Sequence, residues 1–193
     1  VAQGRARRVL VHTDAVQALG KIELHFGRLG VDYLTLAPHK CGGPKGVGIL
    51  IARRVAPLEA WVRGGPQEGG VRGGTENVAA IVGAAVAVVK AIKQQPAQAV
   101  QWAPLRDALE TRILAALPGA KAWGRGSPRV ANTTFISVPG IEAEAALMQL
   151  SQRGVHAASG AACSSKLPGL TSNGASLNVR TVAVEAGKLK MRL

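Results

Sequence analysis

The stretch VDYLTLAPHKCGGPKG, residues 31–46, places an apolar run directly before His39, Lys40 and a turn rich in glycine and proline. Apolar residues followed by polar ones are typical of a parallel strand whose carboxyl end faces a site. A lysine there becomes a nucleophile when burial or neighbouring positive charge lowers its pKa, and it then forms Schiff bases with aldehydes. The alternative is an ordinary surface lysine on a turn.

Strand patterns flank this stretch on both sides. Residues 9–15, VLVHTDA, are apolar and then polar, and residues 46–54, GVGILIARR, are β-branched and begin with glycine. These runs predict an open α/β sheet in which Asp14 and Lys40 project from the carboxyl ends of adjacent strands, with Gln17 one turn further on. A carboxylate there can hold a pyridine nitrogen protonated, whereas the alternative for Asp14 is a helix N-cap before AVQAL.

A helix is predicted over residues 75–95, opened by Thr75, and the prolines of QQPAQAVQWAP then interrupt the pattern. We therefore place a domain boundary near residue 97, giving domains 1–97 and 98–193. The second domain shows a helix, a strand and a helix in turn, followed by one more strand near the end of the chain. These elements predict a small α+β domain. The first helix is predicted over residues 105–117, the strand over 129–139, the second helix over 142–154, and the last strand within 171–193.

The apolar run Val78–Val89 is shorter than the ~20 residues that span a bilayer, so we expect a buried helix and no membrane association. No secretory signal is visible. The chain begins with Val1 and enters a strand almost at once, which indicates a part of a longer protein.

Charge and cysteine content limit the classes of function. The formal net charge is +13, but the basic residues are scattered and aromatic residues make up only 3%, so nucleic-acid binding is not expected as the main role. The two cysteines, Cys41 and Cys163, form no CxxC pair, which argues against a zinc site or a disulfide framework. The pattern indicates a reducing compartment, and we expect a cytoplasmic protein.

Two later stretches have the composition of functional loops. Residues 64–78, GGPQEGGVRGGTENV, let the backbone approach a ligand closely, and Thr75 offers a hydroxyl to an anion, although a flexible surface loop has the same composition. Residues 156–165, HAASGAACSS, surround Cys163 with small side chains that leave a thiol accessible. The alternative for Cys163 is an inert small hydrophobic residue.

Four ordered motifs together resemble the cysteine desulfurases of the class V aminotransferase family, which have the aspartate-aminotransferase-like fold (fold type I). The motifs are HTDAVQALGKI, HKCGGPKGVGILIARR, GGPQEGGVRGGTENV and ASGAACSS. The resemblance implies that residues 1–97 are the remainder of a cofactor-binding large domain. Residues 98–193 would then be a small carboxyl-terminal domain that carries the catalytic cysteine loop.

The resemblance also implies a role for each residue around pyridoxal 5'-phosphate. Lys40 would hold the cofactor as a Schiff base, Asp14 would pair with the pyridinium nitrogen, and Gln17 would bond the phenolic oxygen. His39 would bind the phosphate. Thr75 would reach the phosphate of the neighbouring subunit's cofactor, so a homodimer is implied.

Cys163 would attack the sulfur of a cofactor-bound L-cysteine, leaving alanine and a persulfide on Cys163. A sulfur-acceptor protein would take this sulfur, for sulfur transfer or for iron–sulfur cluster assembly. Alternatives are a class V aminotransferase-like enzyme with another substrate, and an inactive basic binding module.

The chain departs from the family pattern in three places. Ala37 stands where the family commonly has a phosphate-binding serine. The terminal stretch SLNVRTVAVEAGKLKMRL matches poorly, with Arg180 the nearest candidate for binding the substrate carboxylate. The amino-terminal half of the family's chain, with its ring-stacking histidine, has no counterpart here.

Overall fold

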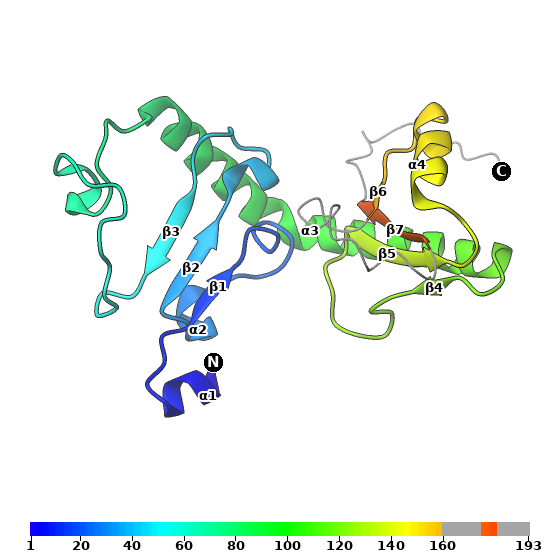
Figure 1. The fold of residues 1–193 in the computed structure, drawn as a ribbon, viewed down its shortest axis with the longest axis horizontal. Helices are drawn as coiled ribbons and strands as arrows, with labels where there is room; N and C mark the ends of the chain where they lie inside the picture. Colours follow the sequence, from blue (N-terminus) through cyan, green and yellow to red (C-terminus); the bar gives the residue numbers. More distant parts are fainter. Residues whose placement is uncertain (160–174, 181–193) are drawn as a thin grey trace. The chain divides into compact units, whose positions relative to one another are not determined.

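The computed structural model describes residues 1–159 and 175–180, with side chains described for 1–159. The chain divides into two compact units, Val1–Gln98 and Ala99–Leu193 (Figure 1). The predicted boundary lies at residue 97, and the roles assigned to the two parts stay predictions.

The first unit contains a three-stranded sheet in the order β1-β2-β3. The strands are β1 (His12–Asp14), β2 (Tyr33–Leu36) and β3 (Ile49–Ala52), all within the runs predicted as strands. β1 and β2 are parallel, and β3 is antiparallel to β2. A parallel pair needs a crossover connection, and this one contains the short helix α2 (Phe26–Leu29); a second short helix, α1 (Ala2–Ala6), precedes β1. Neither helix was predicted.

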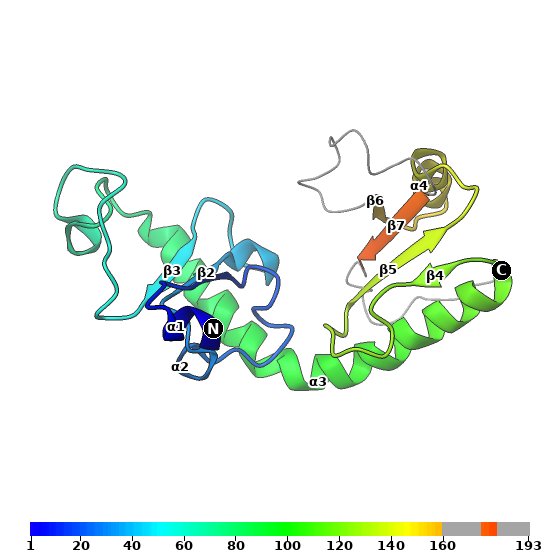
Figure 2. The same cartoon turned by 60° about the horizontal axis from the view of Figure 1, so that its bottom comes forward.

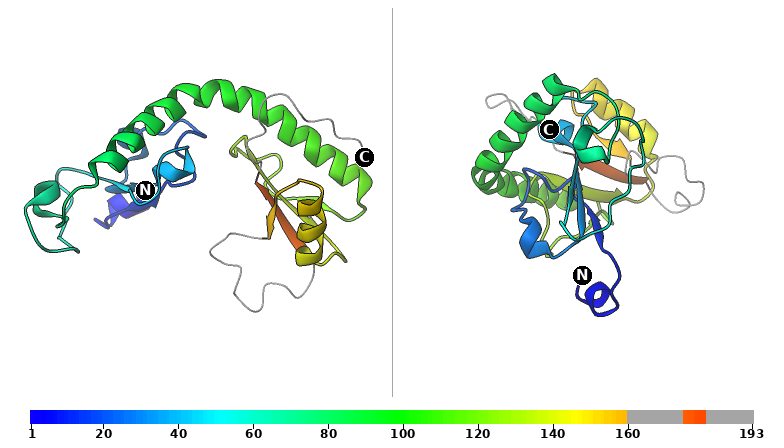
Figure 3. Two further views of the ribbon diagram at one scale, coloured as in Figure 1. Left: turned by 90° about the horizontal axis from the view of Figure 1, so that it is seen from above. Right: turned by 90° about the vertical axis from the view of Figure 1, so that its left-hand side faces the viewer.

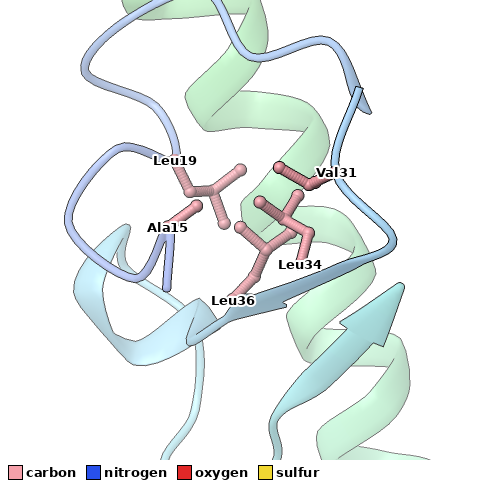
Figure 4. Packing of buried hydrophobic residues seen from close by; sticks show 5 residues of the cluster. All are labelled: Ala15, Leu19, Val31, Leu34 and Leu36. Atoms are coloured by element: carbon pink, nitrogen blue, oxygen red, sulfur yellow. The ribbon is translucent and has the colours of Figure 1, made fainter. Parts of the chain in front are cut away.

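One face of this sheet carries the core of the first unit. The buried cluster joins the turn after β1 to β2, and the first part of the long helix α3 lies beside it (Figures 2 and 4). Val88 of α3 packs against the cluster. Burial of these side chains fixes the sheet face that α3 covers, because apolar area removed from water is the main stabilising contribution. The cluster consists of Ala15, Leu19, Val31, Leu34 and Leu36.

Helix α3 (Val78–Ala116) is longer than predicted and continues through both prolines (Figure 3). The expectation of a break between residues 95 and 105 was wrong. Pro96 and Pro104 lack the N–H that would bind the carbonyls of Ile92 and Val100. Because Ile92 and Val100 are 57% and 77% exposed, water can reach this side of the helix and the free carbonyls need no protein partner.

The start and the burial of α3 also differ from the prediction. Asn77, not Thr75, caps the helix: its side-chain oxygen accepts a hydrogen bond from the Ala80 amide at 3.1 Å. The expected buried helix is buried only along an alanine stripe, whereas its valines are exposed, including Val86 at 64% and Val89 at 67%. The buried stripe consists of Ala80, Ala84 and Ala87.

By length and composition alone, α3 is sufficient to cross a membrane, since its 39 residues include a window of mean hydropathy 1.4. The prediction that this segment is too short to do so rested on the apolar run alone and was wrong about the length. Length and composition of one helix are weak evidence of a span, because a mostly buried core helix of a soluble protein passes the same test; in α3, 17% of the apolar window is buried.

The second unit contains a four-stranded antiparallel sheet in the order β4-β5-β7-β6. Helix α4 (Ala143–Gln152) lies in the segment predicted to be helical and contacts β6 and β7. β5 and β7 lie in the runs predicted as strands. The strands are β4 (Lys121–Ala122), β5 (Thr133–Val138), β6 (Ala158–Ser159) and β7 (Ala175–Arg180).

A buried ion pair joins α3 to the loop before β5 within the second unit. Glu110 is fully buried and binds Arg129 through both carboxylate oxygens, at 2.5 and 2.7 Å, while the Thr134 hydroxyl donates to the same carboxylate. Arg106 binds the half-exposed Asp107 at 2.8 Å and donates to the Val130 carbonyl. The hydrogen bond from Arg129 lowers the pKa of Glu110 and raises that of Arg129, so both groups are charged in the folded protein.

Candidate functional site

Asp14 ends β1, and Gln17 lies in the turn that follows. Both side chains are exposed. Asp14 Oδ1 accepts a hydrogen bond from the Val16 amide at 2.9 Å, which forms an Asx turn; no helix follows Asp14 before α2, so the alternative of a helix N-cap was wrong. Asp14 Oδ2 accepts no hydrogen bond from any residue that the structure describes. The Gln17 side-chain oxygen binds Lys21 Nζ at 2.5 Å, which leaves the amide group of Gln17 as a donor.

His39 and Lys40 lie in a short 3₁₀ helix, η1 (Pro38–Lys40), directly after β2. The Lys40 amide donates to the Ala37 carbonyl at 3.0 Å, and the Gly43 amide donates to the Pro38 carbonyl at 2.9 Å. A Cβ at Gly43 would lie 2.9 Å from Pro38 Cβ, so only glycine allows the chain to close against the buried proline. The backbone of this turn is therefore fixed, while the side chains of His39 and Lys40 are exposed.

These residues gather at one edge of the sheet. β1 and β2 are parallel and directly paired, with Asp14 opposite Thr35, so the segments after both strands lie at the same carboxyl edge (Figure 1). Among the described residues, no hydrogen bond or ion pair joins Asp14 or Gln17 to His39 or Lys40. The fold thus brings the two segments to one edge and leaves their functional groups available to a ligand.

Thr75 lies in a separate glycine-rich loop before α3. This loop has a defined structure: Gly73 donates to the Val62 carbonyl at 2.8 Å, and the Gln67 side-chain oxygen accepts from the Gly74 amide at 3.2 Å. The loop closes tightly at its base, because a Cβ at Gly73 would lie 2.8 Å from the Gly64 nitrogen. Thr75 itself is exposed, and no described contact links it to the carboxyl edge of the sheet.

The remaining predicted site residues are described in part or not at all. Cys163 lies outside the described residues. Arg180 is the last residue of β7, where it pairs with Thr133 across the sheet, and only its backbone is described. The described cysteine, Cys41, is half-buried, and its Sγ contacts the Pro38 carbonyl at 3.2 Å; burial raises the pKa of this thiol, against a smaller lowering effect of Lys21.

Two polar residues near this edge were not predicted as site residues. His12 Nε2 lies 3.2 Å from Thr35 Oγ1, on the same sheet face as Asp14. The signal in the sequence was the alternation of a strand, which places residues two positions apart on one face. Among the described residues, no group of three or more His, Cys, Asp or Glu side chains is arranged to hold a metal ion.

The donor set at the carboxyl edge fits pyridoxal 5'-phosphate. A primary amine (Lys40), a carboxylate with one oxygen free of described partners (Asp14), an amide donor (Gln17) and an imidazole (His39) are all exposed at this edge. They match the aldehyde, ring nitrogen, phenolic oxygen and phosphate of that cofactor. Ala37 is buried at the start of η1 and supplies no hydroxyl to a phosphate.

The parallel pair, its crossover and the site at the carboxyl edge fit a fold type I architecture, and similarity to solved structures shows this fold class. A NifS-like protein superposes with a TM-score of 0.74 at 35% identity, over 82% of this chain and 43% of that one. A NifS-like protein from Rickettsia africae gives a TM-score of 0.82 at 28% identity, over 92% of this chain and 49% of that one. The predicted fold class is confirmed.

The family model for class V aminotransferases matches residues 1–181, and the chain belongs to this family. The cysteine desulfurase NifS of Azotobacter vinelandii is 42% identical over 157 residues, which are 81% of this chain and 39% of that protein. A cysteine desulfurase of Klebsiella pneumoniae is 44% identical over 156 residues, with the same two shares. The chain therefore spans about two fifths of the length of these curated relatives.

Proposed function

We propose that this chain is part of a pyridoxal-phosphate-dependent cysteine desulfurase, which takes sulfur from L-cysteine and leaves L-alanine. The observation that carries the proposal is the shared carboxyl edge of β1 and β2, where Asp14, Gln17, His39 and Lys40 stand exposed. The names of the most similar curated relatives support it, since they are cysteine desulfurases at 40–44% identity.

Each residue has a distinct task in this proposal. Lys40 anchors the cofactor through its amine, and Asp14 keeps the ring nitrogen protonated by accepting its hydrogen bond. Gln17 donates a hydrogen bond from its amide group to the phenolic oxygen, while His39 binds the phosphate. When bound, the cofactor supplies an electron sink for cleavage of bonds at the substrate's α-carbon and β-carbon.

The later steps of the proposal depend on residues beyond this edge. The thiolate of Cys163 attacks the substrate sulfur, and an S–S bond forms as the substrate's Cβ–S bond breaks. The electron pair of the broken bond stays on the carbon, which takes up a proton to give alanine, and the persulfide on Cys163 passes its outer sulfur to an acceptor protein. Thr75 contributes its hydroxyl to the phosphate of a second subunit, so the complete enzyme is a homodimer. Arg180 binds the substrate carboxylate. We place the enzyme in the cytoplasm, in keeping with a sequence whose two cysteines form no CxxC pair.

Borohydride reduction tests the cofactor site directly. The 193-residue chain is mixed with pyridoxal 5'-phosphate, reduced, digested and mapped by mass spectrometry. We expect a phosphopyridoxyl adduct on Lys40 that disappears in Lys40→Ala. Lys45→Ala is the matched control, because Lys45 is an exposed lysine of the same loop, and this variant should label as well as the wild type. Equal labelling of Lys40 and Lys45 would contradict a dedicated site.

Sulfur transfer is tested separately with cysteine as substrate. The proposal expects alanine formation that is lost in Cys163→Ala. Retained turnover of other amino acids in Cys163→Ala, without alanine release from cysteine, would assign the chain to a class V enzyme with another substrate.

A further inference from the structure

The first-unit sheet has one face that the described residues leave open. Cross-strand register places His12, Tyr33 and Ala52 in one row of this face, and Asp14, Thr35 and Leu50 in the next. His12, Asp14 and Leu50 are exposed, whereas Leu34 and Leu36, on the opposite face, are buried. Asp14 therefore belongs to a polar face that extends beneath the site edge.

Thr35 is bound to β1 on both sides of Asp14. Its backbone carbonyl accepts the Ala15 amide at 2.9 Å, and its hydroxyl lies 3.2 Å from His12 Nε2. Since Asp14 and Thr35 are direct cross-strand partners, these two contacts bracket the aspartate along the strand. The Val16 amide, two residues further along the chain, donates a hydrogen bond to Asp14 Oδ1. The arrangement holds the Asp14 backbone and one carboxylate oxygen, and it leaves Oδ2 facing no described partner.

Other ionisable groups near this face are engaged elsewhere. The Tyr33 hydroxyl donates to the Pro57 carbonyl, and Arg53 Nε donates to the Val31 carbonyl at 2.7 Å. On β3 the face consists of Leu50 and Ala52, which carry no charge. His12 is thus the titratable neighbour that shares the face of β1 with Asp14, two residues apart and about 7 Å along the strand.

We propose that His12, held by Thr35, is a positioning residue for Asp14, and that the pair orients the carboxylate toward the ring nitrogen of the cofactor. The expected effect on cofactor binding rests on the proposed function, whereas the contacts of His12, Thr35 and Asp14 do not depend on it. The sequence pattern H-x-D at the end of β1, with threonine opposite the aspartate, is the unit that performs this role.

Hydrogen exchange of the Val16 amide tests the geometry without cofactor, because that amide reports whether the Asp14 carboxylate is held. His12→Ala and Thr35→Val remove the His12–Thr35 contact, and the looser Asp14 carboxylate should then let the Val16 amide exchange up to about tenfold faster, the limit set by full loss of its own hydrogen bond to Oδ1. His12→Gln places an amide group near the position of Nε2, where it can donate to or accept from the Thr35 hydroxyl, and should restore slow exchange. Thr13→Val is the control, since Thr13 lies on the opposite face, and the Leu19 amide reports any general loosening of the turn.

Cofactor binding then tests the consequence. His12→Ala and Thr35→Val should each weaken binding of pyridoxal 5'-phosphate about tenfold and shift its absorption band, and the double variant should be no weaker than either single variant. Unchanged Val16 exchange in both single variants would overturn the inference. If the wild-type chain forms no adduct at Lys40, the proposed function fails, whereas Val16 exchange still decides whether His12 positions Asp14.

Discussion

At the residue scale, Glu110 is the most tightly held charged group in the described part of the chain. It has no exposed surface, and its two oxygens bind Arg129 and the Thr134 hydroxyl. A buried pair of this kind is weak evidence of net stabilisation, because desolvation offsets much of the attraction. Removing one partner is strongly destabilising, since it leaves the other charge buried without compensation.

Glu110→Gln should therefore destabilise the second unit by about 3 kcal/mol, the lower end for breaking a buried pair. Asp107→Asn is the matched control: Asp107 also binds Arg129, at 3.4 Å, but its side chain is 52% exposed, so the loss should stay below about 1 kcal/mol. Urea unfolding followed by circular dichroism measures both. Equal losses in the two variants would contradict the special role of burial at Glu110.

The lowered pKa of Glu110 gives this pair a pH dependence with a definite sign. In the acid range the unfolded chain binds more protons than the folded one, so stability increases with pH there. The contribution is complete above the unfolded pKa of glutamate, about 4.3, and is lost as the pH falls through the lower folded value. Unfolding midpoints measured from pH 7 to pH 2 should decrease more steeply in the wild type than in Glu110→Gln.

The sequence identified some of these residues and not others, for physical reasons. The sheet-edge positions of Asp14, His39 and Lys40 could be predicted because polar residues after an apolar strand mark a sheet edge, whereas their roles stay predictions. The pairing of Glu110 with Arg129 was not predicted, because a charged residue on a helix or in a loop looks the same in sequence whether it faces water or a buried partner. Their pairing depends on a 19-residue separation that only the fold closes.

At the element scale, Asp32 connects the strands of the first unit. Its Oδ2 accepts the Val11 amide at 2.8 Å before β1, and its Oδ1 lies 3.6 Å from Arg53 Nε after β3. Asp32→Ala should cost about 1–3 kcal/mol, because it leaves a half-buried amide without an acceptor. Glu23→Ala is the control, as its ion pair with Arg28 is largely exposed and should contribute less than about 1 kcal/mol. Thermal unfolding compares them, and similar losses would contradict the proposed link.

Helix α3 offers a prediction of the opposite sign. Proline in a helix interior costs about 3 kcal/mol relative to alanine, and the greater freedom of the unfolded alanine chain offsets about 1 kcal/mol of the gain. Pro96→Ala should therefore stabilise the chain by about 2 kcal/mol. Gln94→Ala, at an exposed position of the same helix two residues earlier, should change stability by less than about 0.5 kcal/mol. No gain in the denaturation midpoint for Pro96→Ala would mean that α3 does not bear the cost of an interior proline.

The errors in predicting the bounds of α3 arose because local sequence does not show the packing and the hydrogen bonds that decide where the helix begins and continues. Two prolines indicated a break in α3, because local propensity does not include the packing that holds the helix on either side of them. The predicted cap at Thr75 was two residues early, since Thr75 and Asn77 are both good N-cap residues and only the structure shows which oxygen meets an amide. The short helices α1 and α2 are too brief to produce a periodic pattern.

At the scale of the whole molecule, the first-unit sheet has two free edges among the described residues, on β1 and β3. Its open face presents Leu50 at 49% exposure on the edge strand β3. The curated relatives are about two and a half times as long as the segment they share with this chain. Unpaired edges with exposed apolar side chains are sites of association between chains.

The 193-residue chain studied alone should therefore self-associate as its concentration increases, and added salt should strengthen this, because the net charge of +13 opposes contact between copies. Leu50→Lys places a charge on the edge strand and should reduce association at least several-fold. Val55→Lys is the matched control: Val55 is 90% exposed but lies beyond the end of β3, so this variant adds the same charge without changing the strand. Sedimentation velocity at low and high salt distinguishes the two. An equal reduction by both variants would show that net charge, rather than the open face of β3, controls association.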